Sequence, residues 1–300
     1  MAAVARPEVP AGLLQAFWLA LRPRTLSVGA VPVVVGTAVA AAEGHARALP
    51  ALAAGIAALC LQVASNLVND YADFEHGTDG VGRLGPPRAA ASGWLQPQQL
   101  RRAAALAFCV AAVIGVYLVA VGGLWIALGG LLALFSAWAY TAGPSPLGYR
   151  GYGDVLVFVF FGLFAVQGTH VVQTGTLSAG ALVSAIPVGL LATAVLAVNN
   201  LRDLASDAAV GKRTVAVCLG EAAARRYTVA LVLASYAALP LVAAVAGPAA
   251  ALLPLWTLPR AWRWLGAVGK ARGSALNPLL GATARLQLAF GAALALGWLL

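Results

Sequence analysis

Two groups of polar residues, each at the end of a long apolar run, are the residues best suited to chemistry in this sequence. Their members are Asn66, Asp70 and Asp73 in the first group and Asn200, Asp203 and Asp207 in the second. Residues three and four apart share one face of a helix, so each group predicts a polar stripe that continues an apolar helix. Mg²⁺ in proteins commonly uses one or two carboxylates together with substrate phosphates. The spacing therefore favours the four aspartates as catalytic metal ligands that bind a diphosphate through Mg²⁺.

Positive residues in the loops after these helices predict the rest of a diphosphate site. They are Arg83, Arg88, Arg150, Lys212 and Arg213. Arginine and lysine form strong charge-assisted hydrogen bonds with phosphate oxygens, and we expect them to act there with Asn66 and Asn200. Glu75 and Asp79 follow the first stripe and admit a second interpretation, as solvated loop acids that balance nearby cations. Carboxylates placed against apolar spans are costly and are usually functional, which favours function for the four aspartates.

The composition predicts a membrane protein that must position these residues. The chain is 61% hydrophobic and 10% charged, whereas a soluble domain has roughly a quarter charged residues. We expect residues 1–300 to form a single polytopic domain with a short polar N-terminal arm over 1–15. Three cysteines without pairing or ligand spacing predict neither a disulfide nor a metal site.

Runs of about 17–25 apolar residues predict nine membrane-spanning helices. They are expected at 25–42, 48–69, 103–121, 124–141, 154–173, 179–199, 227–246, 249–264 and 283–300. Helices satisfy their own backbone groups in lipid, which offers no partners, so the predicted fold class is an all-α integral membrane bundle. The long loops after the two acid groups are expected to form a lid over a cavity that faces the cytoplasm.

The charges of the loops predict the orientation of the bundle. With nine spans, eighteen of the nineteen lysines and arginines lie on one side, and Arg47 alone lies on the other. Positive loops face the cytoplasm, so the N-terminus is predicted to be cytoplasmic and the C-terminus outside, in the cell membrane. The same one-sided placement in short loops argues against nucleic acid as the partner of a chain with net charge +9.

The two acid motifs, Asn-xxx-Asp-xx-Asp and Asn-xx-Asp-xxx-Asp, resemble the Asp-rich motifs of the UbiA superfamily of intramembrane aromatic prenyltransferases. The segment 22–26 before the first span is similar to the opening segment of that family. Within it, residues 69–93 and 199–220 look most like the branch that acts in menaquinone synthesis. The resemblance implies a Mg²⁺-dependent transfer from a polyprenyl diphosphate to 1,4-dihydroxy-2-naphthoate, with loss of carbon dioxide and diphosphate to give demethylmenaquinol. No obligatory protein partner is evident.

Two departures from the family pattern concern particular residues. Asp73 and Asp79 are six residues apart, with Gly77 where the branch that uses hydroxybenzoate has a third aspartate, and this argues against that branch. Asp154 stands where the resemblance predicts glutamate.

His170 and Gln167 lie one turn apart far from the acid groups, and we expect them to make hydrogen bonds between helices. Aromatic rings such as Phe160, Phe161 and Trp138 are expected mainly to pack, or else to shield a carbocation.

Three alternatives remain beside this interpretation. The first is another aromatic prenyltransferase of the same superfamily, which would use the same acid motifs with a different acceptor. A secondary transporter would place its acids near the middle of the membrane at broken helices, whereas these acids lie at helix ends and continue into basic loops. A Mg²⁺-dependent alcohol phosphotransferase would need a long Asp-Gly-xx-Ala-Arg motif, which this sequence lacks.

Overall fold

The fold was obtained as a computed structural model, and it describes residues 10–79 and 83–300. Within these ranges the chain forms helices and no strands, which confirms the predicted all-α class. The first nine residues of the polar arm expected over 1–15, and Gly80 and Gly82 of the first long loop, lie outside the described residues.

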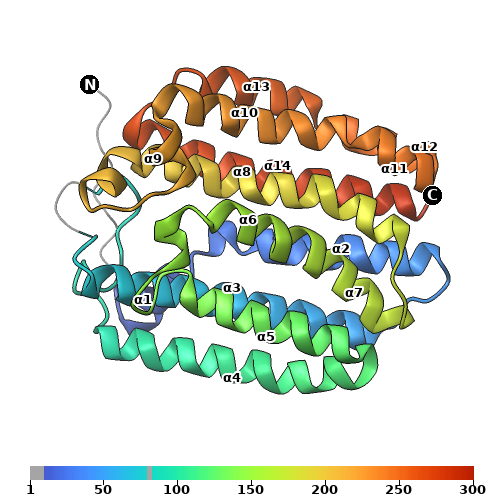
Figure 1. The fold of residues 1–300 in the computed structure, drawn as a ribbon, viewed down its shortest axis with the longest axis horizontal. Coiled ribbons are helices and arrows are strands. Elements are labelled where there is room, and N and C mark those ends of the chain that lie inside the picture. Colours follow the sequence, from blue (N-terminus) through green and yellow to red (C-terminus); the bar gives the residue numbers. More distant parts are fainter. Residues whose placement is uncertain (1–9, 80–82) are drawn as a thin grey trace.

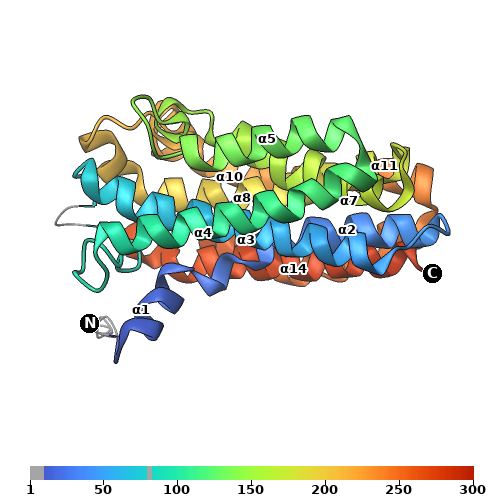
Figure 2. The ribbon, with the colours of Figure 1, turned by 90° about the horizontal axis from the view of Figure 1, so that it is seen from below.

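The helices run side by side along the longest axis of the molecule (Figure 1). In chain order they are α1 (Leu13–Ala20), η1 (Pro23–Thr25), α2 (Ser27–Ala42), α3 (Ala48–Glu75), α4 (Pro97–Gly122), α5 (Leu124–Ala139), η2 (Leu147–Arg150), α6 (Gly153–Val157), η3 (Phe158–Phe164), α7 (Ala165–Thr174), α8 (Ala179–Ala209), α9 (Val215–Leu219), α10 (Glu221–Ala237), α11 (Leu239–Ala246), α12 (Pro248–Leu255), α13 (Leu258–Val268), η4 (Gly273–Leu276) and α14 (Asn277–Trp298). Figure 2 shows that α1 leans away from this bundle.

The chain is a multi-pass membrane protein, but the predicted count of nine spans is not confirmed. Six of the described helices are long and apolar enough to cross a membrane, or up to seven if the pair Leu13–Thr25 and Ser27–Ala42, bent by 51°, is one span. The predicted fourth span is the shorter helix α5, and the predicted eighth is two short helices, α12 and α13. A proline near the end of α12 and another at the start of α13 explain this break, because proline removes a backbone donor.

The helices with the acid groups extend beyond their predicted spans. α3 continues to Glu75 and α8 to Ala209, so both polar stripes are helical as the spacing predicted. Both helices finish at the same end of the bundle, which we call the acid end (Figure 1). Each stops at a glycine in the left-handed region, Gly77 at φ +69° and Gly211 at φ +77°, where a side chain would be strained.

These two glycine stops share one hydrogen-bond pattern. The amide of Thr78 donates to the carbonyl of Asp73 at 2.9 Å, and the amide of Lys212 donates to the carbonyl of Asp207, also at 2.9 Å. A bond across five residues past a left-handed glycine is the Schellman ending of a helix. Each helix therefore ends shortly after the last aspartate of its stripe. The residue that follows the glycine, Thr78 or Lys212, turns back toward the end of the helix.

α8 lies in the centre of the bundle and holds the second acid group in place. It packs against α10, α14 and η3, and most of its apolar side chains are buried. Close approach to η3 depends on small residues, because a Cβ on Gly162 would lie 2.7 Å from the Cα of Gly189. Small residues at such contacts are typical of helices packed in membranes.

Candidate active site

A single cavity of about 1800 Å³ connects both acid groups with the interior of the bundle. Its polar part lies at the acid end, and among the residues that line it are Arg22, Asn66, Asn69, Asp70, Asp73, Arg83, Arg88, Tyr149, Asn199, Asn200, Arg202, Asp203, Asp207 and Lys212. Further in, its wall is mostly apolar, with side chains from α2, α4, α5, η3 and α7. A charged mouth above a long apolar chamber suits an amphiphile with an anionic head and a hydrocarbon tail.

Asp70 fixes the loop that covers the acid end. It is 1% exposed, and its two carboxylate oxygens accept the backbone amides of Ala89 at 3.0 Å and Ala90 at 2.9 Å. The same loop reaches the far side of the cavity, where the carbonyl of Leu84 accepts from Asn277 Nδ2 at 2.8 Å. The described part of this loop therefore lies over the cavity, in the place where a lid was predicted.

Asp73 is the point at which several segments meet. Its Oδ2 accepts from Arg88 Nη2 at 3.1 Å, and its Oδ1 accepts from Lys212 Nζ at 2.9 Å. Oδ1 also accepts from Tyr149 Oη at 2.6 Å and from Thr78 Oγ1 at 3.1 Å. Because several segments donate charge-assisted hydrogen bonds to it in a buried place, the Asp73 side chain is held in one orientation.

Lys212 joins the two acid groups to each other, and we call this contact the Lys212 bridge. It follows the helix of the second group, yet its ammonium bonds to Asp73 of the first, at 4.0 Å from Asp207 Oδ1 and 4.4 Å from the centre of the Tyr149 ring. Burial and the Asp73 carboxylate raise the pKa of Tyr149, so its hydroxyl stays protonated and donates.

In the second group, a buried arginine neutralises the central acid. Arg202 Nε donates to Asp203 Oδ1 at 2.7 Å, and its other nitrogens donate to Asn199 Oδ1 at 2.8 Å and Asn277 Oδ1 at 3.1 Å. Arg202 is 3% exposed, so the pair forms part of the cavity wall. This role was not predicted, although an arginine inside the Asn-Leu-Arg-Asp run was the available signal.

Asp79 completes the first group from the loop. Its carboxylate is in contact with Arg83, and Arg88 Nε lies 3.4 Å from its Oδ2. Burial raises the pKa of Asp79 to about 6, against the opposing effect of Arg83. Asp79 therefore balances nearby cations, as the alternative interpretation described, but its side chain is buried and not solvated. Glu75 is half-exposed and paired with Arg101 at 2.6 Å, as that alternative described.

Not all of the predicted diphosphate residues reach the cavity. Arg83, Lys212 and Asn200 line it, but Arg150 and Arg213 are exposed and do not. Asn66 also lines it, and its Nδ2 donates to the carbonyl of Leu21 at 3.0 Å. That bond ties α3 to the segment that leads from α1 to α2.

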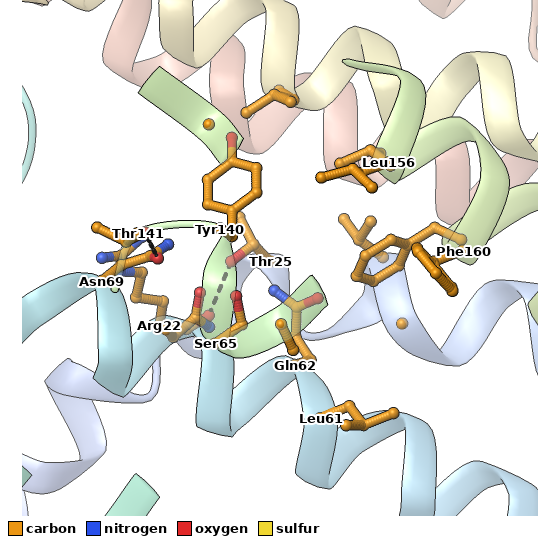
Figure 3. Close-up of a pocket in the computed structure, with 18 of the residues that line it drawn as sticks. Arg22, Thr25, Leu61, Gln62, Ser65, Asn69, Tyr140, Thr141, Leu156 and Phe160 are labelled. Atoms are coloured by element: carbon orange, nitrogen blue, oxygen red, sulfur yellow. Dashed lines mark hydrogen bonds between the residues drawn. The ribbon is translucent and has the colours of Figure 1, made fainter. Parts of the chain in front are cut away.

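Arg22 is a cavity cation that was not predicted as a site residue. It is the one described non-glycine residue with positive φ, at +56°, and its Nη2 is buried with no hydrogen-bond partner among the described residues. Strained backbone of this kind is often found at functional sites. In Figure 3, Arg22 lies with Ser65 and Asn69 on one wall, and Leu156 and Phe160 lie across the cavity.

The other residues considered from the sequence lie in different places. His170 Nε2 is 2.7 Å from Glu43 Oε2, and Ser178 Oγ donates to Glu43 Oε1 at 2.6 Å, which confirms His170 as a hydrogen-bonding link between helices. Asp154 accepts from Tyr227 at 3.1 Å behind the cavity wall. For Gln167 the same prediction of a hydrogen bond between helices is wrong, because its Oε1 is buried with no hydrogen-bond partner among the described residues. Phe160 and Phe161 line the cavity, whereas Trp138 and Gln167 do not.

The donor set is compatible with Mg²⁺ that arrives with a phosphate ligand. No three histidine, cysteine or acidic side chains of the described residues form a ready metal cage. Mg²⁺ seldom uses an all-protein cage and commonly takes one or two carboxylates plus substrate phosphates. Four aspartates with several asparagine oxygens on one cavity meet that requirement.

Comparison with known proteins adds relatives in sequence and in fold. Residues 30–280 match the UbiA prenyltransferase family. The 1,4-dihydroxy-2-naphthoate octaprenyltransferase of Escherichia coli (strain K12) is 43% identical over 214 residues, which are 69% of this chain and 69% of that protein. The enzyme of the same name from Mycobacterium leprae is 40% identical over 67% of this chain and 68% of its own length.

Two solved structures share the arrangement of helices. A UbiA homologue from Aeropyrum pernix superposes with a TM-score of 0.67 at 17% identity, covering 92% of this chain and 98% of that one. A UbiA homologue from Archaeoglobus fulgidus bound to DMAPP and Mg²⁺ has a TM-score of 0.66 at 15% identity, covering 93% and 98%. At this identity the likeness concerns the fold.

Proposed function

This chain belongs to the UbiA prenyltransferase family, and from that membership we propose that it is a Mg²⁺-dependent 1,4-dihydroxy-2-naphthoate polyprenyltransferase. It would transfer a polyprenyl group from an allylic polyprenyl diphosphate to the naphthoate, releasing carbon dioxide and diphosphate and giving demethylmenaquinol. The observation that supports this most is the convergence of two aspartate groups and several cations on the mouth of one apolar cavity.

We assign the diphosphate of the donor to the charged mouth. Asp70, Asp73, Asp203 and Asp207 would hold Mg²⁺, which supplies positive charge to the departing diphosphate. Arg83 and Lys212 would bind its oxygens directly, with Asn200 as a neutral donor. Preorganised charge of this kind stabilises negative charge as it builds on a leaving group.

The chamber below the mouth separates the two reacting carbons from water. The bond between the allylic carbon and the diphosphate oxygen breaks, and that carbon bonds to the naphthoate ring at the position that bears the carboxylate. Carbon dioxide then leaves with its bonding electrons returned to the ring, which becomes aromatic again. Phe160 and Phe161 line this chamber, and their ring faces would stabilise the allylic cation. The tail would lie along the apolar wall and reach lipid between helices.

The orientation follows from the distribution of charge. We propose that the acid end faces the cytoplasm, with the N-terminus cytoplasmic and the C-terminus outside, because the basic loops gather at the acid end. The two loops that begin at the acid motifs would then exchange water-soluble diphosphate with the cytoplasm. We also propose that residues 1–300 act as a single catalytic domain.

A direct assay tests the reaction. Purified protein would be incubated with a labelled polyprenyl diphosphate and either 1,4-dihydroxy-2-naphthoate or 4-hydroxybenzoate, with and without Mg²⁺. Mass spectrometry should find a Mg²⁺-dependent product of the naphthoate alone, one that lacks the carboxylate of the acceptor. A product that keeps the carboxylate would refute the decarboxylating route, and comparable turnover of 4-hydroxybenzoate would refute the choice of acceptor.

A further inference from the structure

The last eighty residues of the chain have an unbalanced charge. After Glu221 the sequence contains no aspartate or glutamate, but it contains seven cations. They are Arg225, Arg226, Arg260, Arg263, Lys270, Arg272 and Arg285. Glu221 itself is shared by Arg225 at 2.9 Å and Arg272 at 3.4 Å. Arg260 and Arg263 therefore have no acidic partner among the described residues.

These two arginines lie on the outer surface of the bundle. In Figure 1, α12 and α13 follow one another along its edge beside α10. Ala261 and Trp264 of α13 are buried against the bundle, where Trp264 Nε1 donates to Thr283 Oγ1 at 2.8 Å. The opposite face of α13 presents Arg260, Trp262 and Arg263, and Trp256 lies at the break just before this helix. We call these four residues the α13 basic face.

The arginines of this face belong to the helix and not to the loop that follows it. Arg260 lies eight residues, roughly 12 Å, before the end of α13 at the acid end. The segment that contains α12 and α13 is not among the described helices that are long and apolar enough to cross a membrane. The two arginines therefore lie on the outer side of a short helix.

Both guanidinium groups lean back one turn along the helix, as helical side chains do. Arg260 Cζ lies 4.8 Å from the centre of the Trp256 ring. Arg263 Nε donates to the carbonyl of Pro259 at 3.2 Å. The remaining N–H donors of both arginines have no acidic partner among the described residues, so they can bind an anion that approaches this face from outside the bundle.

We propose that the α13 basic face binds the phosphate of an anionic phospholipid. The two tryptophans favour this ligand, because Trp256 is 68% and Trp262 is 78% exposed and indole rings are suited to the boundary between headgroups and acyl chains. Two arginines supply bidentate donors for one phosphate, and Trp256 holds one of them in place.

The site is tested with the full-length protein in neutral detergent. Thermal unfolding would be followed while dioleoyl phosphatidylglycerol or dioleoyl phosphatidylcholine is added, and native mass spectrometry would count the lipids retained. The anionic lipid should raise the Tm of the unaltered protein by several degrees more than the zwitterionic lipid. Arg260→Gln and Arg263→Gln should each weaken the apparent affinity for phosphatidylglycerol about fivefold, and the double variant should abolish the preference.

Matched variants distinguish a site from general charge. Arg102→Gln removes an exposed cation at the acid end of α4 and should leave the lipid preference intact. Trp256→Leu keeps an apolar side chain but removes the ring under Arg260, and it should weaken binding if the double variant proves too unstable to measure. An Arg102 effect as large as that of Arg260, or an unchanged preference in the double variant, would overturn the proposal. The proposal would also be overturned if farnesyl diphosphate, added without phospholipid, raised the Tm and this rise depended on Arg260 and Arg263.

Discussion

At the scale of single residues, the acid motifs are not free carboxylates that wait for metal. Asp70 is satisfied by two backbone amides, Asp73 by two cations and two hydroxyls, and Asp203 by Arg202. These contacts fix the carboxylates in position before any ligand binds. Preorganisation of this kind is what electrostatic catalysis requires.

Asp73→Asn and Asp203→Asn should each lower turnover by at least about 100-fold, the scale of losing one preorganised electrostatic group. Both should also weaken Mg²⁺-dependent binding of a prenyl diphosphate analogue, because a charged ligand becomes neutral. Steady-state kinetics and a binding titration of the detergent-solubilised protein measure the two effects. Glu75→Gln, a half-exposed acid on the same helix, is the control and should be nearly silent. Near-normal turnover in either aspartate variant would rule out the metal assignment.

Asp79 should make the stability of the protein depend on pH. Its pKa of about 6 in the folded protein exceeds the ordinary value of 3.8, so the folded state holds a proton that the unfolded state has released. That contribution to stability is complete below pH 3.8 and is lost as the pH rises through 6. Between pH 5 and pH 7 the Tm of the unaltered protein should therefore fall about 2–4 °C further than that of Asp79→Asn. Parallel curves for the two proteins would contradict the shifted pKa.

At the scale of helices, the glycine stops of α3 and α8 position the residues that follow them. Gly211→Ala would place a side chain at φ +77°, where no neighbour lies within 4 Å but the backbone is strained by about 1–2 kcal/mol. We expect the KM for the prenyl diphosphate to rise several-fold as Lys212 shifts, with a smaller change in kcat. Gly55→Ala is a control, since its Cβ would meet only Val33 at an ordinary 3.8 Å. Equal KM and kcat values in the two variants would contradict a role for Lys212 in substrate binding.

How much of the site the sequence could predict depended on whether a residue lies on a helix. The stripes of α3 and α8 were predicted correctly because helical spacing alone places Asp70 and Asp73 on one face. The sequence did not distinguish loop cations that face the cavity from loop cations that are exposed, because charge does not determine the direction in which a loop side chain points. Lys212 turns inward after a glycine stop, whereas Arg213, its neighbour, is exposed. The break between α12 and α13 also lowered the number of full spans, despite an apolar sequence.

At the scale of the whole molecule, the gathering of basic loops at the acid end predicts topology. A reporter that is active only outside the cytoplasm should be silent when fused near Gly85, Gly211 or Gly273. The same reporter should be active near Gly175, which follows α7, or at the C-terminus, because α7 and the C-terminus lie toward the other end of the bundle (Figure 1). Activity from the fusion near Gly211 would reverse the orientation and place the acid end outside.

The Lys212 bridge has a consequence for the order of events in a catalytic cycle. With its ammonium 2.9 Å from Asp73, Lys212 neutralises this carboxylate from within the protein itself. On the proposed function, a diphosphate would bind by exchange, in which Lys212 would leave the carboxylate for a phosphate oxygen and Asp73 would become available to hold Mg²⁺. When the prenyl chain has been transferred, the reverse exchange would compete with the diphosphate for both partners. The protein would thus supply its own competitor for the by-product, with the lysine returning to the aspartate at the end of each turnover.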